Sequence, residues 1–268
     1  MTDIHVSMDI HLQPGYQEFL IDSERKLQLT FRVDEGVRSD VFLRIRNCAD
    51  LEVRTFVAES ADLSMLYWNE AEGKLTAKES YEVMRDAKLT AAYGELNAAD
   101  TERETYVALR QPGANALVSS ASLVKNRKDY RMNVVNFAQH TYGDMHNYAV
   151  VLKEGKLMID AVGRIVKGAS RSESHQTSRA LSFEAGQNTE ILPELLIDEN
   201  DVQASHAMSI GRIDEEQMYY MQSRGLTSKQ ATALLAQGYL LPVCSSLTNE
   251  ELKAKLQEDM ERKISELC

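Results

Sequence analysis

The stretch Ile4-His5-Val6-Ser7-Met8-Asp9-Ile10-His11-Leu12 alternates apolar and polar side chains along its whole length. Successive side chains of a β-strand point to opposite faces, so this alternation predicts a strand with one buried and one outer face. The same period of two recurs as far as about residue 204, for example over residues 41–46 and 51–54. Polar breaks separate these runs, and few windows have a helical period. The pattern therefore predicts an all-β core built from many short strands.

The turns between these strands carry a second signal. Tight hairpin turns of types I′ and II′ need positive φ, which favours Asn-Gly or Asp-Gly pairs. Neither dipeptide occurs in the chain, which has only 13 glycines and 4 prolines. This absence favours coils of parallel strands over a stack of hairpins. Periodicity alone leaves a sandwich, a barrel and a β-solenoid open, because no exact repeat is visible.

The pattern becomes helical from Ile213 onward. Three capping boxes follow one another, and in each a side-chain oxygen can accept a hydrogen bond from a free N–H at a helix start. The paired residues are Asp214 with Gln217, Thr227 with Gln230, and Thr248 with Glu251. Gly225 and Gly238 are the predicted ends of the first two helices, because glycine tolerates the left-handed cap.

The last predicted helix has an apolar stripe with a spacing of four residues. The stripe consists of Leu252, Leu256, Met260 and Ile264 and is continued by Leu267, while the other positions are mainly charged or polar. Such a stripe packs either on its own domain or on a partner. The sequence leaves both alternatives open.

Composition excludes several classes of protein. The chain has 41 acidic and 30 basic residues among its 268, and a formal charge of −11, which disfavours general binding of nucleic acid. The longest apolar run, residues 239–244, is far shorter than the roughly 20 residues that span a bilayer. The first residues also lack the basic and apolar regions of a signal peptide. We therefore expect a cytoplasmic protein that contacts neither nucleic acid nor a membrane.

The three cysteines, Cys48, Cys244 and Cys268, are too few for a disulfide framework or for a four-thiolate cluster site. Cys48 and Cys244 are expected to be small buried residues, and Cys268 lies at the frayed end of the chain.

Motifs for catalysis are missing from the sequence. It contains no G-x-S-x-G nucleophile elbow and neither of the common glycine-rich phosphate loops. His5, Asp9 and His11 share one face of the first strand, where a polar outer face is a simpler interpretation than a metal site. His140 and His146 flank residues 142–144, which are predicted to form a loop. The sequence therefore does not predict an enzyme.

The segment from Gly168 to Val243 contains the most specific signal. It includes GASRSESHQTSRALSF, PELLIDENDVQASHAMSIGRIDEEQMYYMQSRGL and TSKQATALLAQGYLLPV. The combination of His175-Gln176-Thr177, Ser205-His206 and Asp214-Glu215-Glu216 before Ser223-Arg224-Gly225 resembles the carboxy-terminal core of the SufB/SufD family of iron–sulfur cluster assembly proteins. The resemblance is stronger to the SufD side of the family, in a short form without its amino-terminal helical region.

This resemblance implies a fold and a set of partners. The implied fold is a right-handed parallel β-helix over residues 1–212, followed by a helical segment over residues 213–268. The implied function is that of a non-catalytic scaffold on which clusters are assembled. A SufB-like subunit, or a second copy of the chain, would bind through the β-helix, and a SufC-type ATPase would bind through the helices. No cofactor would be bound permanently; iron or a transient Fe–S cluster would be shared with a partner subunit.

The resemblance also points to one site residue. His206 matches a SufD histidine near the subunit interface and would be either an iron ligand or a hydrogen-bonding residue of the interface. SufD relatives often have a cysteine two residues earlier, where this chain has Ala204, so no thiolate comes from that position. The alternative to a SufB-paired subunit is a self-sufficient homodimeric scaffold that works with SufC alone.

Overall fold

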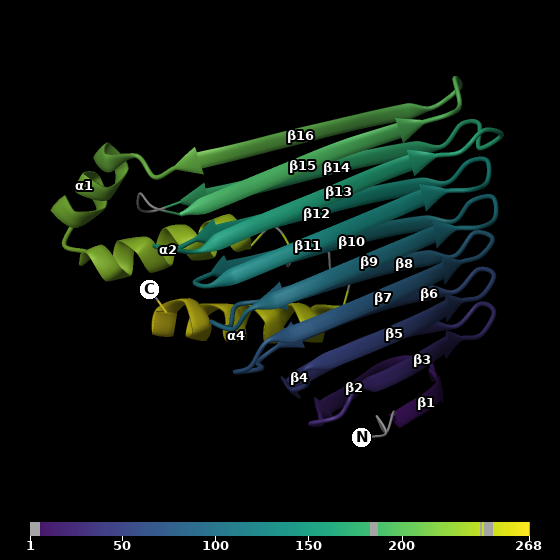
Figure 1. The fold of residues 1–268 in the computed structure, drawn as a ribbon, viewed down its shortest axis with the longest axis horizontal. Coiled ribbons are helices and arrows are strands. Elements are labelled where there is room, and N and C mark those ends of the chain that lie inside the picture. The colour runs from purple at the N-terminus through teal and green to yellow at the C-terminus, as the bar shows by residue number, and fades with distance from the viewer. Residues whose placement is uncertain (1–5, 183–186, 242, 244–248, 268) are drawn as a thin grey trace.

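The computed structural model describes residues 6–182, 187–241, 243 and 249–267, which form sixteen strands and three helices (Figure 1). One sheet, here sheet A, contains β1 (Val6–His11), β3 (Leu27–Val33), β5 (Asp50–Val57), β7 (Leu75–Val83), β9 (Thr101–Leu109), β11 (Arg127–Asn136), β13 (Lys156–Ile165) and β15 (Asn188–Ile197). Sheet B contains β2 (Gly15–Asp22), β4 (Arg38–Asn47), β6 (Asp62–Asn69), β8 (Lys88–Glu95), β10 (Asn115–Val124), β12 (Tyr142–Val151), β14 (Glu173–Ser182) and β16 (Gln203–Arg212). The helices are α1 (Glu215–Ser223), α2 (Ser228–Leu240) and α4 (Glu250–Leu267).

Consecutive strands belong to opposite sheets, and every neighbouring pair within a sheet is parallel. The chain therefore winds as a coil in which one strand of each sheet makes one rung. This arrangement confirms the predicted parallel β-helix with a following helical segment. The rungs grow along the chain: 21 residues separate the register partners Val6 and Leu27, whereas 32 separate Ile159 and Ile191.

The interior of the coil is filled by the alternating residues that the sequence pattern placed on one face. On β4, for example, Val41, Leu43 and Ile45 are fully buried. Because the strands are in register, each inward side chain lies between its partners on the rungs before and after it. Each inner rung is therefore covered on both sides by its neighbours.

The middle of this interior holds buried charges. Arg103 on β9 forms ion pairs with Glu79 and with Glu95, the latter at 2.6 Å, and Lys128 lies 3.6 Å from Glu95. All four side chains are at most 1% exposed. Burial, only partly offset by Arg103, raises the pKa of Glu79 to about 7. Two cations face two carboxyl groups, so the network depends on each partner being present.

One edge of the coil carries a ladder of turns. Each turn between a strand of sheet A and the next strand of sheet B, from β3 to β14, has at least one residue with positive φ. One from each turn, in order, is Gly36, Ser60, Asp86, Gly113, His140 and Arg171, and the turn before β14 also contains Gly168. Most donate a backbone hydrogen bond to the turn of the next rung, for example from Ser60 N to Arg85 O at 2.8 Å. The ladder is a repeat of 24 to 31 residues that the sequence analysis did not detect.

The helix caps confirm some of the predictions and correct others. Thr227 and Gln230 form a complete capping box, and Gly225, with φ of 95°, follows α1 as expected. Asp214 accepts a hydrogen bond from Glu216 N and not from Gln217. Gly238 does not end a helix, because α2 continues to Leu240.

The start of α4 was predicted at the wrong residue. Thr248 lies outside the described residues, and Asn249 caps the helix through bonds from Glu251 N and Leu252 N.

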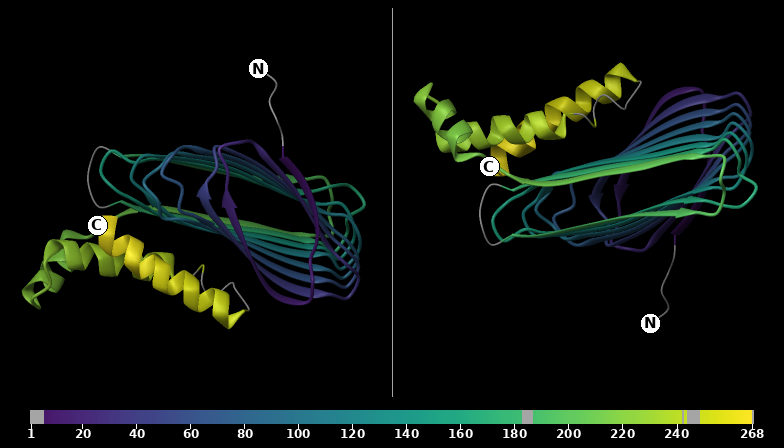
Figure 2. Two further views of the ribbon diagram at one scale, coloured as in Figure 1. Left: turned by 90° about the horizontal axis from the view of Figure 1, so that it is seen from below. Right: turned by 90° about the horizontal axis from the view of Figure 1, so that it is seen from above.

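Helices α2 and α4 cover the outer face of sheet B, while none of the described helices lies over the outer face of sheet A (Figure 2). The stripe Leu252, Leu256, Met260 and Ile264 is buried there against an apolar sheet surface that includes Leu66. Lys255 fastens α4 to β2 through bonds to Tyr16 Oη at 2.7 Å and Glu18 Oε2 at 2.8 Å. The stripe therefore packs within its own chain; the side chain of Leu267 lies outside the described residues.

We expect Arg103→Met to lower the free energy of unfolding by about 3–5 kcal/mol, because it leaves two carboxyl groups buried without their main cation. Arg131→Met is the matched control: Arg131 pairs with Glu104 on the outer surface, where an ion pair contributes at most about 1 kcal/mol. Chemical denaturation of both variants measures the difference. Equal effects would contradict a structural role for the buried network.

We expect Gly113→Ala to lower the free energy of unfolding by about 1–2 kcal/mol, because Gly113 has a φ of 78° and a Cβ there would collide with the Asp86 carboxyl group. Gly238→Ala is the control. Gly238 is exposed within α2 with free space around it, so alanine should stabilise the helix by up to about 1 kcal/mol. Thermal unfolding of the two variants should move in opposite directions, and a shift in the same direction would disprove the assignment.

Candidate functional site

The last rung of the coil, β15 and β16, is the strongest candidate for a functional surface. Strand β15 pairs only with β13 and β16 only with β14, so each has one free backbone edge (Figure 1). The inward side chains of this rung have no further rung above them, and Met208 and Ile210 are 49% and 46% exposed. On the outer side, Leu192 and Leu196 are also exposed. Free strand edges beside exposed apolar side chains are typical of a surface that pairs with another chain.

His206 lies in the middle of this surface. Its register partner on β14 is Gln176, which is buried inside the coil, so His206 is on the inward-facing side of β16 at the open end. The same side of β16 carries Ala204, which partners Ser174. The imidazole is exposed and free to contact a ligand or an incoming chain.

A second group of polar side chains lies on the outer face of sheet B beside the last rung. His175 Nδ1 is 2.7 Å from Ser205 Oγ, and His175 Nε2 is 3.1 Å from Glu173 Oε2. The ring of Tyr142 packs on His175 at 5.7 Å between centroids. Burial and nearby Asp144 raise the pKa of Tyr142. These contacts hold His175 in place within its own chain.

The other histidines predicted from the sequence are far less informative. Residues 142–144 are not a loop but the start of β12, because they pair in parallel with β10 and β14. His146 Nε2 lies 3.1 Å from Asp144 Oδ2 on that strand, and His140 is in the turn before it. The two histidines therefore do not form one site.

Of the first-strand group, Asp9 and His11 are on the outer face with Arg32 and Asp34 as partners, as a polar outer face predicts, and His5 lies outside the described residues. Across the described ranges, no group of three or more His, Cys, Asp or Glu side chains is placed to hold a metal ion.

Of the three cysteines, Cys48 is buried, as predicted. Cys244 and Cys268 lie outside the described residues.

The helical arm provides a second exposed surface. No residue of α1 is buried, and Tyr219 and Tyr220 are 74% and 59% exposed. Helix α1 projects from the side of the coil and is joined to it through α2 (Figure 1). Tyr239 on α2 lies beside Ser209 on β16, and burial raises the pKa of Tyr239. The arm and the last rung are therefore in direct contact.

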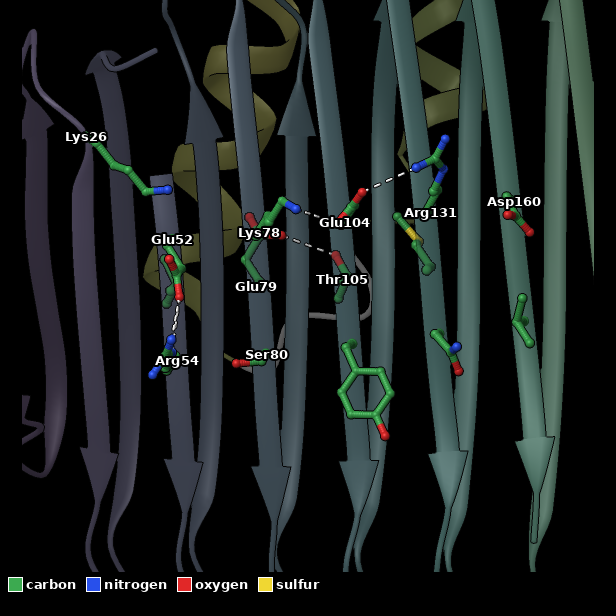
Figure 3. A pocket seen from close by; sticks show the side chains of 15 residues that line it. Lys26, Glu52, Arg54, Lys78, Glu79, Ser80, Glu104, Thr105, Arg131 and Asp160 are labelled. Carbon is green, nitrogen blue, oxygen red and sulfur yellow. Dashed lines mark hydrogen bonds and ion pairs between the residues drawn. The ribbon is translucent and has the colours of Figure 1, made fainter. Parts of the chain in front are cut away.

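The outer face of sheet A holds an open groove of about 690 Å³ (Figure 3). Its charges pair with one another: Arg54 with Glu52 at 2.7 Å, and Glu104 with both Lys78 and Arg131 at 3.1 and 3.3 Å. Both signs of charge are interleaved along the groove, which Asp160 and Lys26 also line, so no patch of one sign marks it as an anion or cation site.

The sequence analysis found His206 but not the surface around it. An uncovered rung leaves no signature in the alternation, because Met208 and Ile210 have the same period as buried residues. The signal that could have found it is the order of elements: the last alternating run is followed directly by helices, so no later strand can cover it.

Comparison with known proteins identifies a family and several relatives. Residues 16–239 match the family model for the SUF system FeS cluster assembly SufBD core domain. The iron–sulfur cluster assembly protein SufD of Bacillus subtilis (strain 168) is 31% identical over 182 residues, which cover 67% of this chain and 42% of that protein.

Two further relatives match about half of the chain. SufD of Escherichia coli (strain K12) is 24% identical over 149 residues, covering 54% of this chain and 35% of the relative. An iron–sulfur cluster assembly SufBD family protein of Pyrococcus horikoshii is 26% identical over 149 residues, covering 52% and 31%. The matches thus span less than half the length of these relatives. Among the described helices, none has the length and apolar character needed to cross a membrane.

Proposed function

Because the chain belongs to the SufBD core family of the SUF iron–sulfur cluster assembly system, we propose that it is a SufD-like, non-catalytic scaffold subunit of that system. In this proposal the last rung pairs with another subunit, the helical arm binds a SufC-type ATPase, and His206 binds iron at the junction. Iron and the nascent cluster are cargo that passes through the complex.

The observation that carries the proposal is the uncovered last rung. An incoming strand can pair with the free edge of β16 and bury Met208 and Ile210. His206 would then lie inside the interface, where a ligand can be shared by two chains. The partner is a SufB-like subunit or, alternatively, a second copy of this chain related by a two-fold axis.

The helical arm supports the second contact. Exposed tyrosines are common anchors of protein interfaces because they combine a large apolar ring with a polar hydroxyl. Tyr219 and Tyr220 lie together on α1, and α2 connects that helix to β16 through Tyr239. An ATPase bound to α1 could therefore transmit movement to the interface that contains His206.

We expect the double variant Met208→Asp and Ile210→Asp to lose subunit pairing but not its fold, because both side chains are about half exposed in the single chain. Light scattering after size-exclusion chromatography measures the mass of the chain alone and mixed with a SufB-like subunit. The control is Met8→Asp with Leu20→Asp at the opposite end, where both side chains are 51% exposed. Pairing only in the mixture supports the heteromeric subunit, and pairing of the chain alone supports the homodimer. If the unmodified chain pairs in neither sample, the scaffold proposal is wrong.

We expect Tyr219→Ala with Tyr220→Ala to weaken binding of a SufC-type ATPase by at least about tenfold, which corresponds to 1.4 kcal/mol. Calorimetric titration gives the Kd. Tyr106→Ala, an exposed tyrosine on the uncovered sheet A, should leave the Kd unchanged. Similar affinities for both variants would place the ATPase elsewhere.

A further inference from the structure

Directly beneath His206 the interior of the coil becomes polar. Ser174 and Gln176 point inward from β14 and are 1% and 2% exposed, one rung below Ala204 and His206. In the earlier rungs Val41 and Met65 occupy the column of Gln176, which is apolar there. Two polar side chains at this depth need partners, because an unpaired buried polar group costs free energy.

The two side chains meet above a glycine of the opposite sheet. A Cβ at Gly163 on β13 would collide with both Ser174 Oγ and Gln176 Nε2. Gln176 Nε2 donates a hydrogen bond across the interior to the carbonyl oxygen of Glu194 on β15, at 2.8 Å. This bond fixes the orientation of the amide. The absence of a side chain at Gly163 gives both groups the room they occupy.

One oxygen atom of each side chain is left without a partner in the protein. Gln176 Oε1 and Ser174 Oγ are both buried, and neither forms a hydrogen bond with any described residue. Parallel neighbours in a sheet are about 4.8 Å apart, so the backbone of His206 lies one rung from that of Gln176 at the open end. The two oxygen atoms therefore lie in the last covered layer of the coil, one rung below His206.

We propose that Ser174 and Gln176 form an oxygen-donor subsite beneath His206 that receives a single ferrous ion before cluster assembly. This inference rests on the proposed function. An imidazole nitrogen is a suitable ligand for iron, and the group offers no thiolate to a softer ion such as Cu(I). All three groups are neutral, so the ion is held weakly and can be passed on, as cargo requires.

The test is an anaerobic titration of the full chain with ferrous ammonium sulfate, followed by calorimetry and by Mössbauer spectroscopy of ⁵⁷Fe. We expect one ion per chain and no binding by His206→Ala. Ser174→Ala should weaken binding about tenfold without lowering the unfolding temperature, because Ser174 Oγ bonds to no described residue. Ser178→Ala is the control: Ser178 lies on the same inward face and accepts a hydrogen bond from Asn147, so it should lose stability and keep its iron affinity.

Substitutions of Gln176 distinguish a role as an iron ligand from a purely structural role through its hydrogen bond to Glu194. Gln176→Glu keeps the oxygen and adds a charge but loses the hydrogen bond to Glu194, whereas Gln176→Met loses both. If Gln176 is a ligand, the glutamate variant binds iron at least as tightly as the unmodified chain and shifts the Mössbauer isomer shift or quadrupole splitting, while the methionine variant binds about tenfold more weakly.

The outcomes distinguish this inference from the function on which it rests. If His206→Ala abolishes binding while Ser174→Ala and both Gln176 variants retain the unmodified affinity, the subsite is disproved and the role of His206 stands. If the unmodified chain binds no ferrous ion, alone or in its pairing complex, both iron roles are disproved. The pairing assay then still decides the scaffold proposal independently.

Discussion

Each rung of this protein depends on the rung beside it. The parallel register places every inward side chain of an inner rung between two partners, so its burial depends on the rungs before and after it. The same constraint has an unavoidable consequence at the ends, where one side of the rung has no neighbour. The apolar side chains of β16 and its free edge are exposed for this reason. The stacking of rungs in register therefore explains both the buried interior and the exposed last rung.

The helices bury apolar side chains that would otherwise be exposed on one face of the coil. The outer face of sheet B carries Phe42, Leu66 and Trp68, which are buried only because α2 and α4 lie over them. Lys255 ties α4 to the first rungs, and Tyr239 ties α2 to the last. The helical segment therefore spans the coil from end to end. Helix α1 follows β16 after only two residues and also packs on α2, so a movement of α1 would reach the last rung directly through the backbone.

The sequence predicted a large part of this architecture. Period-two alternation identified the strands, and the resemblance over Gly168–Val243 identified the β-helix and His206. The sequence analysis missed the turn ladder because its positive-φ positions hold five different residue types: Gly, Ser, Asp, His and Arg. What most of them share is a backbone hydrogen bond to the next rung, which the sequence does not show. Charges such as Arg103 and Lys128 have the parity of inward residues, but a single chain pattern does not show which carboxyl groups will neutralise them. The buried polar pair Ser174 and Gln176 was not predicted either, because Gln176 and Gly163 are thirteen positions apart in the sequence and come together only across the coil.

The growth of the rungs from 21 to 32 residues gives the coil a taper. The described part of β1 has 6 residues, whereas β16 has 10. A strand as short as β1 would leave several backbone groups of the β16 edge unpaired, whereas a strand of similar length to β16 would pair along the whole edge. The taper therefore favours a partner whose strands match β16 in length.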